Sequence, residues 1–349
     1  MKILISGNLG YIGPVLTKHL KQTIACSEIT GLDTGYFASR ISSLGRIGDT
    51  YCNDQIYQDI RDVSFEFLKK FDAVIILSAI SNDPMGNKFE DVTNQINYLA
   101  VKKIIEPYLK LKNKRLVFAS SCSMYGASEG EAKKENDTLN PLTAYSKSKV
   151  AVEKALQKCE LGLGTTATSL RFATACGMSD RLRLDLVLND FVASAIIRRK
   201  IEVLSDGTPW RPLIHVKDMA RAIEWGVLRN AKIAKPYLAV NVGSNSWNYK
   251  VSDLAKAVVE TVPDCQLSFN EKALPDKRSY KVNFDLFEKL APGYNPVYRL
   301  QDAISELVDG ISEIKHLIPD DFQSSDFMRL HILENHLNNG RLSSDLRWV

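Results

Sequence analysis

The sequence predicts an α/β protein with a doubly wound parallel sheet and a smaller C-terminal lobe. Three observations support this prediction. An apolar run at the very start of the chain leads into a glycine-rich turn, strand and helix patterns then alternate, and the alternation becomes irregular after about residue 173. Strands that alternate with helices pair in parallel through right-handed crossovers, so the regular part of the chain is expected to form one sheet covered on both faces.

Six short apolar runs in the first half of the chain have the length and composition of buried strands. They are Ile3 to Ser6, Ile29 to Asp33, Gln55 to Gln58, Ala73 to Ser78, Leu116 to Ser120 and Thr166 to Arg171. Helical patterns separate them, at residues 11–20, 64–70, 91–111 and 143–160. Because proline has no backbone N–H, Pro107 is expected to kink the third of these helices or to start a new one.

The second half is predicted to contain fewer regular elements. Loops are expected near residues 177–183 and 206–212, a helix near 216–229, and a strand near 238–242 that returns to the sheet. We therefore divide the chain into a first domain at 1–173 and a lobe at 174–349. From about residue 320, apolar residues at helical spacing predict a docked helix or an interface element. These residues are Phe322, Phe327, Leu330, Ile332 and Leu333.

Composition excludes several classes of protein. The 349 residues are 45% hydrophobic and 25% charged, with no long apolar run, which does not favour a membrane protein. The start of the chain is too short an apolar run for a signal peptide, so a cytoplasmic location is expected. A net charge of +4 gives little support to nucleic-acid binding. Six cysteines without a CxxC pair predict neither disulfides nor a metal site.

The glycine turn after the first strand predicts a dinucleotide site of the Rossmann type. Gly7 permits the tight turn, Gly10 lets backbone N–H groups approach a pyrophosphate, and Gly13 allows close packing of the helix on the strand. Tyr11 and Ile12 lie between the last two glycines and are expected to contact the cofactor as well.

Asp33 ends the second strand, 20 residues after Gly13, where a carboxylate can accept from an adenosine ribose. A carboxylate there would repel a 2′-phosphate, which favours NAD over NADP. A role as a helix cap or turn residue is the alternative. Asp59 and Ile60 follow the third strand, where the aspartate could accept from the adenine amino group or cap a helix. The segment Leu77, Ser78 and Ala79 follows the fourth strand and completes the expected cofactor contacts.

Tyr145 and Lys149 lie four residues apart on a predicted helix, so their side chains project from one face. A tyrosine ordinarily titrates near about 10, and a neighbouring positive charge lowers this pKa by favouring the phenolate. Beside an oxidised nicotinamide, Tyr145 could therefore act as a general base toward a sugar or alcohol hydroxyl.

These motifs together resemble the extended short-chain dehydrogenase/reductase superfamily, and within it the nucleotide-sugar epimerases and dehydratases related to UDP-galactose 4-epimerase. The resemblance also includes the serine-rich run Ser120 to Gly126 and the run Trp210 to Asp218. It implies that Ser121 binds the sugar oxygen being oxidised, with Ser123 assisting, while Tyr145 removes the proton. Lys149 would hold the nicotinamide ribose and lower the pKa of Tyr145, and a hydride would pass to NAD.

The resemblance also implies contacts to a nucleotide-diphosphate sugar from the C-terminal, substrate-binding lobe. Arg211 matches an arginine that clasps the diphosphate and Asn189 an asparagine of this lobe, while Arg278 is a looser second phosphate contact. Asn82 and Asp83 follow the fourth strand and either read sugar hydroxyls or form a turn before Pro84. Thr174 stands where an asparagine is usual, so its contacts are uncertain, and His215 is expected to support a loop.

Most nucleotide-sugar 4,6-dehydratases carry an aspartate and a glutamate where this chain has Cys122 and Ser123. That departure favours 4-epimerisation over dehydration, which needs a general acid and base at the departing hydroxyl. Cys122 is expected to pack as a small apolar residue. The alternatives are a 4-ketoreductase or dehydrogenase, a dehydratase, and a non-catalytic NAD-binding sensor. The resemblance further implies a homodimer that pairs through the helices near 91–111 and 143–160.

Overall fold

The computed structural model describes residues 1–349 except 46, 129, 233, 271 and 273–278. Its centre is a parallel sheet in the order β10-β6-β5-β4-β1-β2-β3, which confirms the doubly wound prediction and the return of a late strand to the sheet. The strands are β1 (Lys2–Ser6), β2 (Glu28–Asp33), β3 (Asp54–Tyr57), β4 (Ala73–Ile76), β5 (Arg115–Ser121), β6 (Thr166–Phe172) and β10 (Tyr237–Val242). Because β1 pairs with both β2 and β4, the strand order reverses beside β1, where α/β proteins bind ligands.

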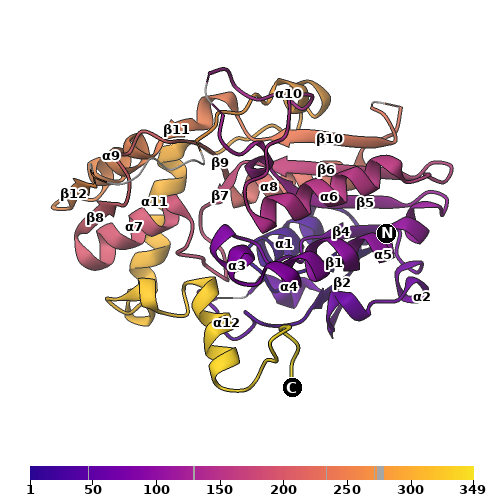
Figure 1. The fold of residues 1–349 in the computed structure, drawn as a ribbon, viewed down its shortest axis with the longest axis horizontal. Helices are drawn as coiled ribbons and strands as arrows, with labels where there is room; N and C mark the ends of the chain where they lie inside the picture. Colours follow the sequence, from indigo (N-terminus) through magenta and orange to yellow (C-terminus); the bar gives the residue numbers. More distant parts are fainter. Residues whose placement is uncertain (46, 129, 233, 271, 273–278) are drawn as a thin grey trace.

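Helices cover both faces of this sheet (Figure 1). On one face α1 (Gly13–Thr23) packs against α8 (Val216–Leu228), and α10 (Asp285–Leu290) packs on β10. On the other lie α2 (Phe65–Leu68), α5 (Val101–Leu109) and α6 (Ala144–Lys158). Side chains of a strand alternate between faces, so Ile3 and Ile5 of β1 enter the first core and Leu4 enters the second.

The segment 91–111, predicted as one helix with a kink or a new start at Pro107, is interrupted at another position. It consists of α4 (Glu90–Asn94), a π-helical segment at Gln95–Ala100, and α5, which continues through Pro107. Pro107 lies in the last turn of α5, where the loss of its N–H removes one hydrogen bond near a helix end. The irregularity lies upstream, and the new helix does not begin at Pro107. Before α4, a short α3 (Asp83–Lys88) follows the fourth strand.

The C-terminal lobe is more regular than its sequence suggested and has a hydrophobic core of its own. A strand begins inside the predicted loop at 206–212, which corrects that prediction: β9 (Trp210–His215) pairs with β7 (Thr174–Cys176) and β11 (Asn248–Lys250). The remaining elements of the lobe are α7 (Val187–Arg198), β8 (Lys200–Val203), α9 (Val251–Thr261), β12 (Gln266–Phe269) and α11 (Leu300–Glu313).

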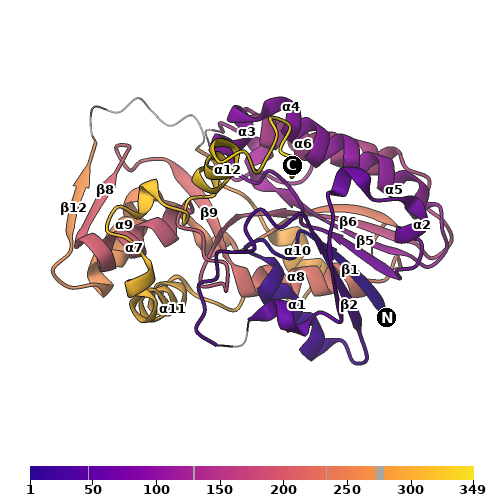
Figure 2. The same cartoon turned by 90° about the horizontal axis from the view of Figure 1, so that it is seen from below.

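The last residues of the chain leave this lobe and cross to the sheet domain. Figure 2 shows α12 (Arg329–Asn338) beside α3, and the C-terminus near the helices that cover the sheet. Phe322 and Phe327 belong to the core of the lobe, whereas Leu333 belongs to the core of the sheet domain. The apolar residues from 320 onward therefore do not form one helical face as their spacing suggested, because they serve two separate cores.

Candidate active site

A cavity of about 860 Å³ runs from the glycine turn to the C-terminal lobe. The turn itself leaves no room for side chains. Gly7 has φ +86°, and a Cβ placed there would lie 2.4 Å from the backbone N of Ser78. A Cβ on Gly13 would lie 1.9 Å from the backbone O of Asn8. Gly10, Tyr11 and Ile12 line the cavity just ahead of the N-terminus of α1, a place that fits a pyrophosphate.

Two aspartates organise the end of the cavity where the sequence predicts the adenosine. The carboxylate of Asp33 accepts from the backbone N–H of Leu9 at 3.0 Å and of Gly35 at 2.7 Å. Burial raises the pKa of Asp33, while these two bonds oppose the shift. Asp59 accepts from the backbone N–H of Arg61 at 2.8 Å and also pairs with its guanidinium. Both aspartates line the cavity and also hold their own loops, so the turn role is observed for each, and their contacts to the cofactor stay a prediction.

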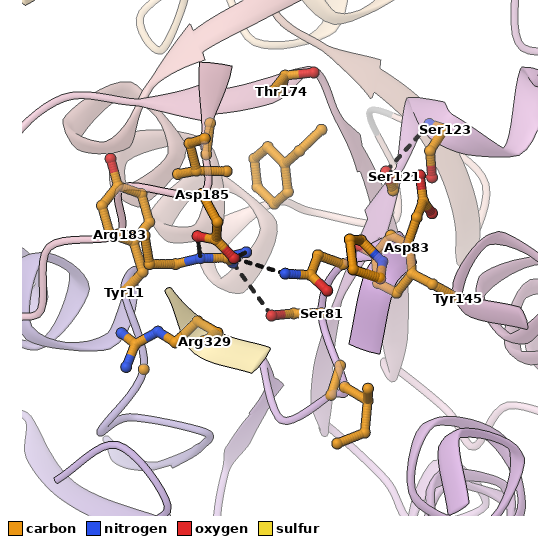
Figure 3. Close-up of a pocket in the computed structure, with 18 of the residues that line it drawn as sticks. Tyr11, Ser81, Asp83, Ser121, Ser123, Tyr145, Thr174, Arg183, Asp185 and Arg329 are labelled. Atoms are coloured by element: carbon orange, nitrogen blue, oxygen red, sulfur yellow. Dashed lines mark hydrogen bonds and ion pairs between the residues drawn. The ribbon is translucent and has the colours of Figure 1, made fainter. Parts of the chain in front are cut away.

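Ser121, Tyr145 and Lys149 meet at the other end of the cavity (Figure 3 shows the first two, beside Ser123). Thr143 starts α6 with a reciprocal capping box, which fixes the first turn where Tyr145 lies. Lys149 follows one turn later and donates to the backbone O of Ala119 at 2.7 Å, and its Nζ lies 5.4 Å from the Tyr145 ring centre. The Ser121 Oγ donates to the Ser123 Oγ at 2.9 Å.

The protonation states at this end differ from the expectation. Burial raises the pKa of Tyr145 to about 12, although a hydrogen bond with Ser121 opposes the shift. Burial also lowers the pKa of Lys149 to about 7, against the attraction of Glu153. The prediction that Lys149 acidifies the phenol is thus wrong for the protein alone. Both groups are removed from water, which disfavours the phenolate and the ammonium alike.

A buried ion pair supports the strand that carries Ser121. Arg171 and Glu153 pair at 2.7 Å, and Glu153 also accepts from the Ser120 hydroxyl at 2.6 Å. Cys122 turns away from the cavity: it is fully buried, and its thiol donates to the backbone O of Arg171 at 3.1 Å. Burial raises the pKa of Cys122 far above its usual value, so the residue packs as expected from the sequence.

The wall facing the catalytic end is a polar network that the sequence analysis missed in part. Arg183 and Asp185 form an ion pair at 2.9 Å, and Asp185 also accepts from Asn82 at 2.6 Å (Figure 3). Arg183 donates to the hydroxyl of Ser81 at 3.2 Å. A recognisable signal was present, because charged residues alternate with leucines from Arg181 to Leu186.

Asn82 and Asp83 line the cavity, and they begin a helix where an isolated turn was the alternative; their contacts to sugar hydroxyls stay a prediction. Asn82 caps α3 by accepting from the backbone N–H of Met85 at 2.8 Å. Asp83 accepts from the hydroxyl of Thr143 at 2.7 Å, which links α3 to the cap of the Tyr145 helix. Asp83 therefore ties this part of the cavity lining to α6, while Asn82 ties it to Asp185.

The remaining predicted contacts divide into three groups. Ile60, Leu77, Ser78, Ala79, Thr174 and Arg211 line the cavity. Asn189 does not: it is fully buried and bonds to Gly177 and Tyr11, so it holds the loop behind the wall, which corrects its assignment to substrate. Arg278 lies outside the described residues. His215 caps α8 and stacks on Tyr298 at 4.2 Å, in line with a supporting role.

Among the described residues, no group of histidine, cysteine and acidic side chains is arranged to hold a metal ion. In the same part of the chain, no helix is long and apolar enough to cross a membrane.

The fold and the cavity together fit a dinucleotide-binding protein built on a doubly wound parallel sheet. The chain belongs to the NAD-dependent epimerase/dehydratase family, whose model matches residues 3–243, and NAD is therefore its cofactor. The glycine turn and the residues at both ends of the cavity fit that cofactor.

Relatives and solved structures agree with this assignment. The chain is 24% identical to an uncharacterized UDP-glucose epimerase, YtcB, of Bacillus subtilis over 90% of this chain and 99% of that protein. It is 25% identical to protein CapI of Staphylococcus aureus over 88% of this chain and 98% of that protein. The structure of UDP-glucuronic acid 4-epimerase from Bacillus cereus, in complex with UDP-glucuronic acid and NAD, superimposes with a TM-score of 0.76 at 21% identity, covering 91% of this chain and all of that one.

Proposed function

We propose that the protein is a nucleotide-diphosphate sugar 4-epimerase. The observation that carries the proposal is the meeting of Ser121, Tyr145 and Lys149 at one end of a cavity whose other end is the glycine turn. When bound, NAD would supply the chemistry of transient oxidation, as a reversible hydride acceptor for the sugar carbon. Relatives named UDP-glucose 4-epimerase, from Streptomyces lividans among others, support the same reaction class.

Each of the three side chains has a defined task in this proposal. The Ser121 hydroxyl holds the sugar oxygen, and the Tyr145 phenol exchanges a proton with it during oxidation and reduction. With a pKa of about 12, the phenol needs a nearby positive charge to ionise at neutral pH. Lys149 is placed to provide such a charge when it is protonated, because it projects from the same helix face.

The substrate contacts are proposed from the lining of the cavity. The network of Asn82, Arg183 and Asp185 faces the catalytic end and would bind sugar hydroxyls, since Asp185 already neutralises Arg183. Arg211 would bind a phosphate of the diphosphate. The position after Ser121 argues against dehydration, because Cys122 is buried and Ser123 offers a hydroxyl instead of a carboxyl group.

The proposal is tested by incubating purified protein with UDP-glucose, UDP-galactose, UDP-N-acetylglucosamine or UDP-glucuronic acid in D₂O and following the products by NMR. We expect one pair of 4-epimers to equilibrate, without deuterium at C4 and without net change in NADH. Deuterium is excluded because the hydrogen removed from C4 is the one returned. A stable 4-keto product would indicate dehydration or oxidation, and steady NADH consumption would indicate a ketoreductase.

We also propose a homodimer that pairs through α5 and α6. A surface groove runs between these helices, lined by Tyr98, Lys102, Ala151 and Lys154 among others, and Leu99 beside it is half exposed. Light scattering of the purified protein would measure twice the chain mass of 39.1 kDa if this is correct, and the chain mass itself if it is not.

A further inference from the structure

We infer that the C-terminal segment 322–349, called the strap here, is part of the cofactor site and controls how fast NAD leaves the protein. The strap lies outside the residues that the family model matches. The inference depends on NAD binding and is independent of which sugar reaction the enzyme performs.

The strap runs from the lobe to the sheet domain (Figure 2). Its beginning is anchored in the lobe by Phe322 and Phe327. Its end is anchored in the core of the sheet domain by Leu333, Leu342 and Leu346. Between the two anchors, the strap contributes lining to the cavity itself, from Gln323, Met328 and Arg329.

The end of the strap holds the loop that follows β2, where the adenosine is expected. The indole Nε1 of Trp348 donates to the backbone O of Thr34 at 2.6 Å, and the hydroxyl of Tyr36 donates to the backbone O of Leu346. Trp348 also packs against Tyr36, with ring centres 5.8 Å apart. Thr34 and Tyr36 line the cavity, so the strap fixes their positions directly.

The strap holds the loop after β3 in the same way. Arg61, which pairs with Asp59, donates to the backbone O of Asp345 at 2.8 Å. The neighbouring Asp62 pairs with Arg347 at 2.6 Å. Both loops that flank the adenosine are therefore fastened to one terminal segment, and opening either of them breaks contacts to the strap.

The start of α12 adds a buried cation at the edge of the cavity. Arg329 is 2% exposed, its guanidinium lies 4.2 Å from the ring centre of Phe37, and it donates to the backbone O of Arg181 at 3.2 Å. Figure 3 shows Arg329 on the same side of the cavity as Tyr11 and Arg183. This cation has acidic neighbours in Asp185 and Asp33, and it also faces the two cations Arg181 and Arg183. An anionic cofactor reduces that repulsion, which couples strap closure to cofactor binding.

The test compares cofactor release from NADH-loaded protein after mixing with excess NAD, followed by the loss of NADH fluorescence. Deletion of residues 345–349 is expected to speed release at least about tenfold, because it removes Leu346, Arg347 and Trp348 together. Trp348→Ala is expected to speed it by a smaller factor. In each case the circular dichroism spectrum should stay that of the parent protein.

A charge swap separates a specific contact from general loosening. Arg347→Glu should speed release, and the double variant Arg347→Glu with Asp62→Arg should slow it again, because the pair is restored with reversed signs. Lys2→Glu is the matched control: it reverses a charge in another exposed ion pair, at the opposite end of the strands. Its release rate should equal that of the parent.

Unchanged release from both the folded deletion variant and Trp348→Ala would overturn the inference, as would equal acceleration in Lys2→Glu. Failure of the 4-epimerase proposal gives a different result, because NADH release is measured without any sugar. A protein that epimerises no sugar but loses NADH faster after strap deletion refutes only the proposed reaction.

Discussion

Replacing Tyr145 with phenylalanine is expected to lower kcat by about 10³-fold while NAD still binds. Removal of a general acid–base group typically costs 10²- to 10⁴-fold, and the phenol is the group placed to exchange the sugar proton. The change deletes one oxygen from a ring that lines the cavity, so the fold and the shape of the cavity are retained. Epimer formation by NMR and NAD affinity by calorimetry give the two readouts.

Tyr280→Phe is a matched control, since Tyr280 is a buried tyrosine that lines the same cavity. It is expected to change kcat by less than about tenfold. If Tyr145→Phe retains most of the parent turnover, or if both variants lose it equally, the assignment of Tyr145 as the acid–base group is wrong. A complete loss of NAD binding in Tyr145→Phe would instead indicate a structural role.

Lys149→Met is expected to reduce turnover by about 10²-fold or more and, in the cofactor-free protein, to raise the unfolding temperature at pH 7. Burial lowers the pKa of Lys149 from 10.5 to about 7 in the folded protein. The folded state therefore resists protonation of this lysine, and each pKa unit corresponds to about 1.4 kcal/mol. Methionine has a similar length and no charge, so it removes this cost.

The pH dependence of this gain has a definite sign. Below pH 7 the lysine is charged in both states, and the parent protein bears the full cost of the buried charge. Between pH 7 and 10.5 the unfolded chain holds one more proton than the folded chain, so the stability of the parent rises with pH. The advantage of Lys149→Met should therefore be largest below pH 7 and should vanish above about pH 10.5.

Thermal unfolding at pH 6, 8 and 10 measures this dependence, and Lys147→Met is the matched control. Lys147 lies on the same helix but is exposed, so its replacement should change neither stability nor turnover by a measurable amount. A gain for Lys149→Met that is equal at all three pH values would show that side-chain packing, and not the buried charge, is responsible.

The strap and the catalytic pair illustrate two different demands on one fold. An enzyme that regenerates its cofactor in every cycle benefits from slow release of NAD, and the strap supplies contacts to both loops at the adenosine end. The proposed catalytic end needs groups that gain and lose a proton near neutral pH. Burial moves the pKa of Tyr145 away from neutral pH and moves the pKa of Lys149 toward it. These requirements are met at opposite ends of the same cavity.

Local sequence patterns were sufficient for the sheet, the glycine turn and the Tyr145–Lys149 pair. Each of them depends on neighbours in the chain. Apolar runs form β1, β2, β4 and β5, and glycines are required where the backbone approaches itself. A four-residue spacing places two side chains on one helical face. The same reasoning did not predict where the helical segment 91–111 is interrupted. The interruption is the π-helical segment Gln95–Ala100, upstream of Pro107.

Tertiary structure alone decided the wall of the cavity, the protonation of the catalytic pair and the course of the strap. Arg183 and Asp185 are brought to Asn82 from about 100 residues away, and Trp348 is brought to Thr34 from the other end of the chain. Burial raises the pKa of Tyr145 where the sequence predicts a lowered one, and burial is a property of the packed protein. The physical reason is that local spacing fixes which side chains share a face. Burial and long-range partners arise only after the sheet domain and the C-terminal lobe have packed together.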